Sequence, residues 1–193
     1  MVDEKTDLPT KAFTSTKTFT TWLAKNHATS DGLWLKIAKK DSGITSVTYL
    51  EALDVALCYG WIDGQKAAYD GDWFLQRFTP RRAKSKWSKI NRTKVTGLIE
   101  RGLMQPAGQA EIDRAKADGR WDAAYGGQRT MEVPEDFLAA LAKSKKASAF
   151  FETISRTNRY AILYRIHDAK KPETRAARIE KFVEMLKNGE TIH

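Results

Sequence analysis

The residues best suited to bind a ligand lie in one short basic stretch. Between Arg77 and Ile99 the sequence contains eight Lys or Arg residues and no Asp or Glu, and aromatic and hydroxyl side chains are interspersed among them. A solvated surface usually mixes charges of both signs, so a stretch of one sign that also carries aromatic rings favours an anionic partner. The side chains expected to bind that partner are Arg77, Arg81, Ser85, Trp87, Ser88 and Asn91.

The expected chemistry is anion binding where a strand gives way to a helix. Pro80 ends the strand because it has no backbone donor, and a helix that starts soon afterwards offers free N–H groups and a partial positive charge. Arginine adds a planar fork for phosphate or carboxylate, and Trp87 can stack on a base or another ring. The alternative is structural: Ser85 only caps the helix, Trp87 belongs to the core, and Arg77 pairs with Asp63 across the sheet.

Asp63 is a second candidate, because it lies among apolar residues in Trp61-Ile62-Asp63-Gly64. Such a carboxyl group is either an acid with a raised pKa or the partner of an arginine. Glu51 and Asp54 on the preceding helix are candidates for a second carboxylate, which would permit acid–base chemistry or metal binding. The simpler interpretation is a salt bridge from Asp63 to Arg77 or Arg81.

No recognised catalytic or cofactor motif accompanies these residues. His27, His167 and His193 are far apart in the sequence and have no partner at metal-ligand spacing. The sequence contains no phosphate-binding loop, no dinucleotide-binding glycine pattern and no zinc signature. We therefore expect no metal, no cofactor and no catalytic residue, and we prefer a binding protein to an enzyme.

The hydrophobic pattern predicts an α+β fold. Residues 33–39 alternate in the manner of a strand, Thr48 and Glu51 form a capping box for a helix that ends at Gly60, and Asp70-Gly71 is a hairpin turn. We expect a small antiparallel sheet of about three strands flanked by helices, followed by an all-helical C-terminal half. The expected strands span residues 33–39, 61–69 and 72–78, residues 1–12 form a strand-like or frayed start, and a helix capped by Ser85 and carrying Trp87 runs to residue 102.

Length and composition fit a globular protein with two parts. We expect an α+β domain over residues 1–131 and a helical subdomain over residues 132–193 that packs on it. The net charge of +9 favours anionic partners, whether nucleic acid, a small phosphate or carboxylate, or a membrane surface. The only cysteine, Cys58, lies in an apolar helical stretch and is expected to be buried. The first ten residues lack an apolar signal core, and no stretch reaches the roughly 20 apolar residues of a membrane span, so we expect a cytoplasmic protein.

Several motifs in order resemble the YdeI/OmpD-associated bacteriocin-protection family over roughly residues 15–188. They are Gly60-Trp61-Ile62-Asp63-Gly64, Arg77-Phe78-Thr79-Pro80-Arg81, the Ser85/Trp87/Ser88/Asn91 spacing, residues 102–108, residues 118–122, residues 133–137 and residues 169–175. The resemblance implies a role in stress or bacteriocin protection and supplies no catalytic residue. A chain of charge +9 would itself repel a cationic peptide.

Three hypotheses follow from the sequence. The first is a non-enzymatic protein that binds a small anionic ligand or phosphate at the Arg77–Asn91 segment. The second is a nucleic-acid-binding protein that uses the same basic face. The third is an enzyme with a site formed by Asp63 and Arg77. The sequence predicts no oligomeric state.

Overall fold

The computed structural model describes residues 8–128 and 130–193, which form two compact units. The N-terminal unit contains the residues up to Trp87 together with Asn91–Ala124, and the C-terminal unit contains Ser88–Ile90 and Tyr125–His193. The long C-terminal segment of the second unit therefore begins at residue 125, whereas the boundary predicted from the sequence lies after residue 131. Each unit has its own hydrophobic core.

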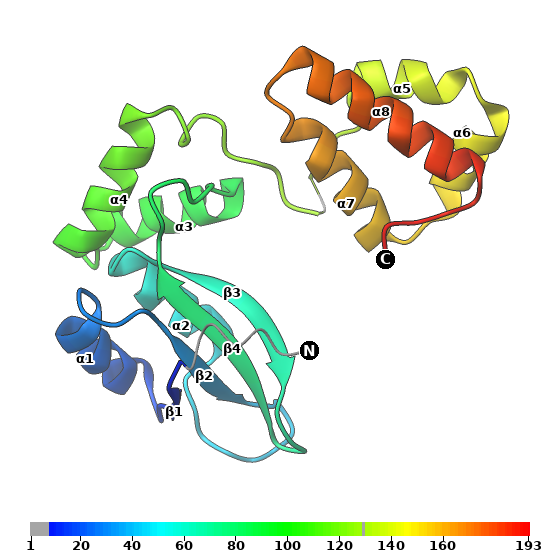
Figure 1. The fold of residues 1–193 in the computed structure, drawn as a ribbon. Coiled ribbons are helices and arrows are strands. Elements are labelled where there is room, and N and C mark those ends of the chain that lie inside the picture. Colours follow the sequence, from blue (N-terminus) through cyan, green and yellow to red (C-terminus); the bar gives the residue numbers. More distant parts are fainter. Residues whose placement is uncertain (1–7, 129) are drawn as a thin grey trace. The chain divides into compact units, whose positions relative to one another are not determined.

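The N-terminal unit contains the sheet and the first helices (Figure 1). Its elements are β1 (Thr10–Ala12), α1 (Thr16–Asn26), β2 (Leu33–Ala38), α2 (Tyr49–Cys58), β3 (Trp61–Ala68), β4 (Trp73–Pro80), α3 (Lys89–Glu100), whose first residues belong to the C-terminal unit, and α4 (Pro106–Ala117). The C-terminal unit contains α5 (Glu135–Ala142), α6 (Lys145–Thr153), α7 (Arg156–His167) and α8 (Pro172–Lys187). The predicted α+β class is confirmed.

The sheet has four strands in the order β1-β2-β4-β3, so the predicted number of three was wrong. The three predicted strands are β2, β3 and β4, and they pair antiparallel. The additional strand, β1, runs parallel to β2 at the edge. All three of its residues are exposed, so its side chains carry no alternating pattern that would reveal a strand. Residues 1–7, which were grouped with it in the sequence analysis, lie outside the described residues.

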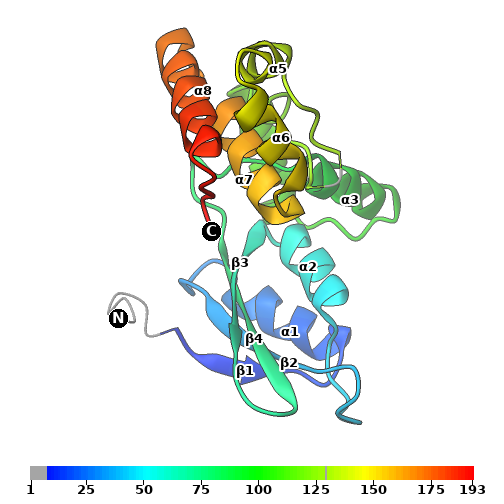
Figure 2. The ribbon, with the colours of Figure 1, turned by 90° about the vertical axis from the view of Figure 1, so that its right-hand side faces the viewer.

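One face of the sheet supplies the core of the N-terminal unit. Leu33, Leu35 and Ile37 of β2 are buried at every second position, and Leu33 is paired with Phe78 of β4. The ring of Phe19 in α1 lies 6.0 Å from the ring of Phe78, which places α1 on this face. Helices α1 and α2 lie side by side against it (Figure 2). Because successive side chains of a strand point to opposite faces, the burial of these residues leaves the intervening side chains on the opposite face of the sheet.

On the central strands β2 and β4, the opposite face, called the outer face below, belongs to no hydrophobic core. It consists of Trp34, Lys36 and Ala38 of β2 and Trp73, Leu75, Arg77 and Thr79 of β4. Trp34, Trp73 and Leu75 are only half-buried, and none of them packs against either of the two cores. This face therefore presents aromatic and cationic side chains that the packing of the unit does not use.

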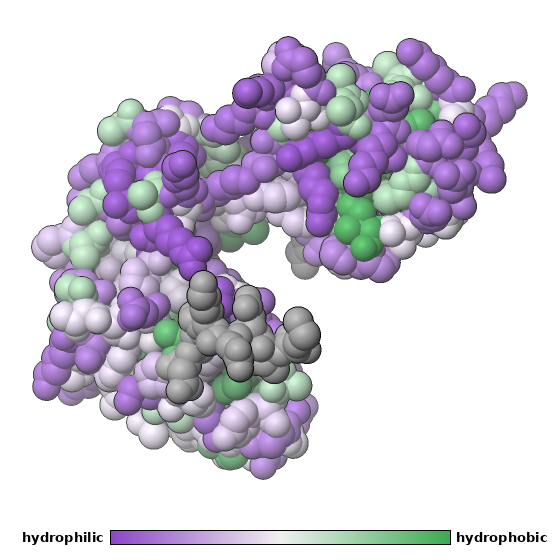
Figure 3. Space-filling view, in the orientation of Figure 1, coloured by the Kyte–Doolittle hydropathy of each residue, from purple (hydrophilic) through white to green (hydrophobic). Residues whose placement is uncertain are grey.

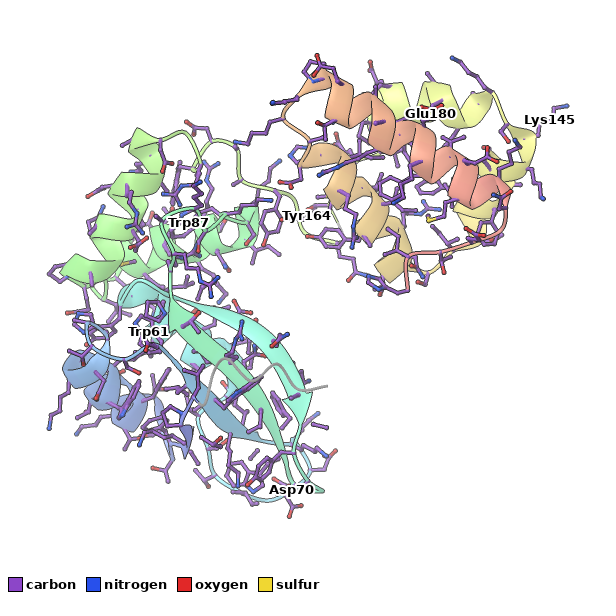
Figure 4. The ribbon with its side chains drawn as sticks, viewed as in Figure 1. Trp61, Asp70, Trp87, Lys145, Tyr164 and Glu180 are labelled. Carbon is purple, nitrogen blue, oxygen red and sulfur yellow. The ribbon has the colours of Figure 1, made fainter. Side chains whose placement is uncertain are left out.

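The hairpin between β3 and β4 is confirmed, with a loop of four residues, 69–72, between the strands. Oδ1 of Asp70 accepts hydrogen bonds from the N–H groups of Asp72 (2.9 Å) and Trp73 (2.8 Å), so the side chain of Asp70 closes the loop. Figure 4 shows Asp70 at the tip of the hairpin.

Helix α2 has the predicted ends. The hydroxyl of Thr48 accepts a hydrogen bond from the N–H of Glu51, and the carboxylate of Glu51 accepts one from the N–H of Thr48 (2.9 Å). Gly60 follows the helix with a φ of 73°, a left-handed conformation that favours glycine. Local sequence thus sets both the start and the stop of this element.

Helix α3 begins later than predicted, because it starts at Lys89 and not just after Ser85. The Ser85 hydroxyl instead accepts a hydrogen bond from the N–H of Arg82 (2.9 Å) and closes a turn. Trp87 therefore precedes the helix. Ser85 has the residue type of a helix cap, but its hydrogen bond is made within this turn.

The C-terminal unit packs its four helices around aromatic side chains. Phe137 of α5 and Phe151 of α6 are buried and meet edge to face, with ring centres 5.4 Å apart. Arg175 of α8 forms two hydrogen bonds to the carboxylate of Asp136 in α5 (2.6 and 2.9 Å), and this guanidinium holds the pKa of Asp136 below its ordinary value.

Within the described residues, no helix of either unit has the length and apolar character required to cross a bilayer. Hydrophilic side chains dominate the face drawn in Figure 3.

Two glycines test the packing of the N-terminal unit. A Cβ atom at Gly108 in α4 would lie 2.2 Å from the carbonyl oxygen of Cys58 and 2.5 Å from Sδ of Met104, whereas one at Gly97 in α3 would meet nothing within 4 Å. We expect Gly108→Ala to lower the free energy of unfolding by about 1–3 kcal/mol, because the helices must move apart. Gly97→Ala should raise it by about 0.5–1 kcal/mol through helix propensity. Urea denaturation measures both changes, and a stabilising Gly108→Ala would contradict the close contact.

Candidate functional site

Arg81 and Trp87, the centre of the predicted anion site, lie inside the N-terminal unit. Only 6% of Arg81 and 1% of Trp87 is exposed. The guanidinium carbon of Arg81 lies 3.7 Å from the centre of the Trp87 ring, and its Nη1 donates to the carbonyl of Lys86 (3.2 Å). Trp121 also packs edge-on against Trp87, with ring centres 5.2 Å apart. Trp87, labelled in Figure 4, is thus a core residue, which is the structural alternative considered above.

Further arginines hold the same part of the unit together. The guanidinium of Arg92 lies 4.8 Å from the centre of the Trp121 ring and donates to the carbonyl of Trp121 (2.8 Å). Arg120 donates to the carbonyl of Ser85 (2.7 Å) and pairs with Asp118 (2.8 Å). Arg81 and Arg120 thus support the turn before α3, and Arg92 holds the segment that contains Trp121. The charged residues of the stretch that remain exposed in this turn are Arg82, Lys84 and Lys86.

Ser88 and Asn91 belong to different units. Ser88 is buried and forms a parallel bridge with Tyr125, as part of the C-terminal unit. Asn91 lies in the first turn of α3 and belongs to the N-terminal unit. The single site predicted from their spacing is thus divided between two units.

Asp63 and Arg77 lie on opposite faces of the sheet. Asp63 is paired with Phe78 on the core face and accepts a hydrogen bond from the hydroxyl of Tyr49 in α2 (2.8 Å). Arg77 lies one residue before Phe78 and therefore points to the outer face. The Asp63–Arg77 salt bridge considered above is not formed, and the structure does not bring the proposed pair of an Asp63/Arg77 enzyme site together.

The two additional carboxylates also have structural partners. Glu51 completes the capping box of α2, and Oδ1 of Asp54 lies 2.6 Å from the ammonium of Lys94. Within residues 8–128 and 130–193, no group of three or more potential metal ligands gathers in one place.

Arg77 lies beside an irregular part of β3 that contains Gly64. The register between β3 and β4 shifts between Asp63 and Lys66. The side-chain amide of buried Gln76 donates hydrogen bonds to the carbonyl oxygens of Gly64 (2.9 Å) and Gln65 (3.2 Å). These bonds satisfy backbone carbonyl groups in the irregular part of β3. A Cβ atom at Gly64 would lie 3.1 Å from Nε of Arg77, so the guanidinium lies across the glycine. Nε of Arg77 is buried and has no hydrogen-bond partner.

The outer face combines cations with aromatic rings. The ammonium of Lys36 lies 4.2 Å from the centre of the Tyr69 ring and 4.9 Å from the centre of the Trp73 ring. Trp34 is the cross-strand partner of Arg77. The guanidinium of Arg77 forms no ion pair within the described part of the chain.

Negative charge is nearly absent from the strands. Their residues include the cations Lys11, Lys36, Lys66 and Arg77 but one carboxylate, Asp63, which faces the core. Trp34, Lys36 and Trp73 were not among the site residues predicted from the sequence. The signal was present, because Trp34 and Lys36 alternate with the buried leucines of β2. Chemically, this face can stack a planar ring and neutralise an anion at the same place.

The Tyr49–Asp63 hydrogen bond predicts a pH-dependent contribution to stability. Burial, and then the adjacent carboxylate of Asp63, raise the pKa of Tyr49 above its ordinary value of 10.0. Because the folded protein favours the neutral phenol, this contribution is complete below pH 10 and is lost as the pH rises through the folded pKa. We expect Tyr49→Phe to lower the unfolding free energy at pH 7 by about 0.5–1.5 kcal/mol and by less at pH 11. Denaturant titration at the two pH values measures this, and a difference that grows at alkaline pH would contradict the assignment.

Two family comparisons divide the chain in nearly the same place as the two units. Residues 130–189 match the family described as Bacteriocin-protection, YdeI or OmpD-Associated, which supports the resemblance noted in the sequence for this part of the chain. Residues 11–111 match a domain of unknown function, DUF8412. No curated protein and no solved structure matches the chain. Since residues 11–111 cover more than half of the 193 residues, the chain belongs to the DUF8412 family.

Proposed function

We propose that the N-terminal unit binds single-stranded nucleic acid on the outer face of its sheet. The observation that carries the proposal is the arrangement of Trp34, Lys36, Trp73 and Arg77 on two adjacent antiparallel strands. These side chains lie outside both hydrophobic cores and share their face with no carboxylate of β2 or β4.

The aromatic residues suit the bases. Every base has a flat face that stacks on an aromatic ring, so Trp34, Tyr69 and Trp73 can hold a strand without selecting its sequence. Trp73 is half-buried and Tyr69 is 51% exposed, which leaves ring surface open to a ligand. In known nucleic-acid-binding domains, aromatic residues on an exposed sheet face stack on unpaired bases. The major groove of a duplex instead accommodates an α-helix or a two-stranded ribbon, which is narrower than a four-stranded sheet. The outer face therefore fits a single strand better than a duplex.

The cations suit the phosphates. Lys36 and Arg77 lie on the outer face itself, whereas Lys11 of the edge strand β1 is paired with Leu35 and so lies on the other face. Asp70 and Asp72 lie in the hairpin loop, so the positive part of the face is the end that contains Arg77 and Trp34. A small anion would use the cations alone and would leave the adjacent rings without a role, which is why a polymer of bases and phosphates is the better fit.

The proposal concerns the N-terminal unit. For the C-terminal unit, the match to the bacteriocin-protection description supports a role in protection at the level of that description. We propose no chemistry for it.

The proposal is tested by fluorescence anisotropy with a short labelled oligothymidylate. Because a base–aromatic stack is worth about 1–3 kcal/mol, Trp73→Ala should weaken binding about 5- to 150-fold. Lys36→Gln should reduce the slope of log affinity against log salt concentration by about 0.7, the share of one phosphate contact on a single strand. A duplex of the same length should bind more weakly than the single strand.

Lys145→Gln is the matched control, since it removes one exposed charge from α6 in the C-terminal unit. It should change neither the affinity nor the salt slope by as much as Lys36→Gln does. Circular dichroism establishes that Trp73→Ala stays folded. Absence of binding by the unchanged protein at low salt, or full affinity in folded Trp73→Ala, would refute the proposal.

A further inference from the structure

We propose a second, separate binding site for a small carboxylic acid with an apolar body, in a pocket of the N-terminal unit. The pocket has a volume of about 290 Å³ and lies among α1, α2, the end of α3 and the connector that follows it. None of its lining residues belongs to a strand, so it shares no residue with the outer face.

The walls of the pocket are apolar. Val55 and Cys58 of α2 and Leu98 of α3 line it and are almost fully buried, while Leu103 lines it from the connector and is 43% exposed. A ligand in the pocket would cover the exposed part of Leu103 and would gain the hydrophobic contribution of that surface. The volume lies at the lower end of the range for ligand pockets, which limits the apolar body to a single ring or a short chain.

Among the charged side chains that line the pocket, Arg101 is the one that favours an acidic head group. Glu51 and Asp54 also line it, but Glu51 accepts hydrogen bonds from the backbone N–H and hydroxyl of Thr48, and Asp54 is paired with Lys94. Arg101 lines the pocket, is exposed and forms no ion pair within the part of the chain that the structure describes. Its guanidinium is therefore available for the two parallel hydrogen bonds that a carboxylate accepts.

The charge of Arg101 acts on the thiol of Cys58, which lines the same pocket. Burial, and then the carboxylate of Asp54, raise the pKa of Cys58 to about 11, while the charge of Arg101 acts in the opposite direction. Because Arg101 and Cys58 line the same pocket, one ligand can contact both. The head group and the apolar body can then be held at the same time.

Cys58, the only cysteine of the chain, also supplies the measurement. The rate of its alkylation by iodoacetamide is followed in the presence of benzoate, hexanoate and their neutral amides. We expect the two carboxylates to slow alkylation in a saturable manner, because a bound ligand covers the thiol and stabilises the folded protein. The amides should do so only at much higher concentration.

Two variants make the test specific. Arg101→Gln should weaken the apparent affinity for the carboxylates about 10- to 100-fold, since a hydrogen bond to a charged group is lost. Arg82→Gln, which removes an exposed arginine of the same unit outside the pocket, should leave protection unchanged. Trp73→Ala should also leave it unchanged, which separates this inference from the nucleic-acid proposal. Equal protection by acids and amides, protection that survives Arg101→Gln, or no protection by either carboxylate would overturn the inference.

Discussion

The antiparallel register of β2 and β4 is the constraint on which the rest of this account depends. It pairs Leu33 with Phe78 on one face and Trp34 with Arg77 on the other. The first pair is buried beneath α1, and the second is left outside both cores. A shift of one residue would exchange the two sets, so the burial of leucine and phenylalanine determines the position of every tryptophan and cation on the outer face. The alternation of side chains along these strands thus determines both the packing of the core and the composition of the proposed binding surface.

Much of the fold was predictable because its signals are local. The capping box at Thr48 and the glycine at position 60 mark the ends of α2, and alternation marks β2. The start of α3 was not predictable in the same way, because Ser85 has the residue type of a cap but makes its hydrogen bond in a turn. Strand β1 was missed as a fourth strand because its exposed side chains carry no pattern and its pairing rests on backbone groups.

The site was harder to predict than the fold. Arg81 and Trp87, which were predicted to share a ligand site, are in contact, but the contact is buried and stabilises the turn before α3. Asp63 and Arg77 were considered as a pair from their positions on neighbouring strands, and the face that each residue occupies separates them. The polar positions of β2 and β4 were visible in the sequence, but their association required the register, which depends on contacts between residues about forty positions apart. Spacing along the chain could therefore identify the basic stretch, but it could not show which side chains of β2 and β4 lie together on the outer face.

The most direct test of the central claim is the response of the tryptophan indole N–H signals in a nitrogen–proton correlation spectrum during titration with oligothymidylate. Trp34 and Trp73 lie on the outer face, whereas Trp61 and Trp87 are 1% exposed in the core. The account predicts that the signals of Trp34 and Trp73 shift with added oligonucleotide while those of Trp61 and Trp87 stay in place. Binding that leaves the signals of Trp34 and Trp73 unmoved would show that the nucleic acid lies elsewhere and would contradict the account.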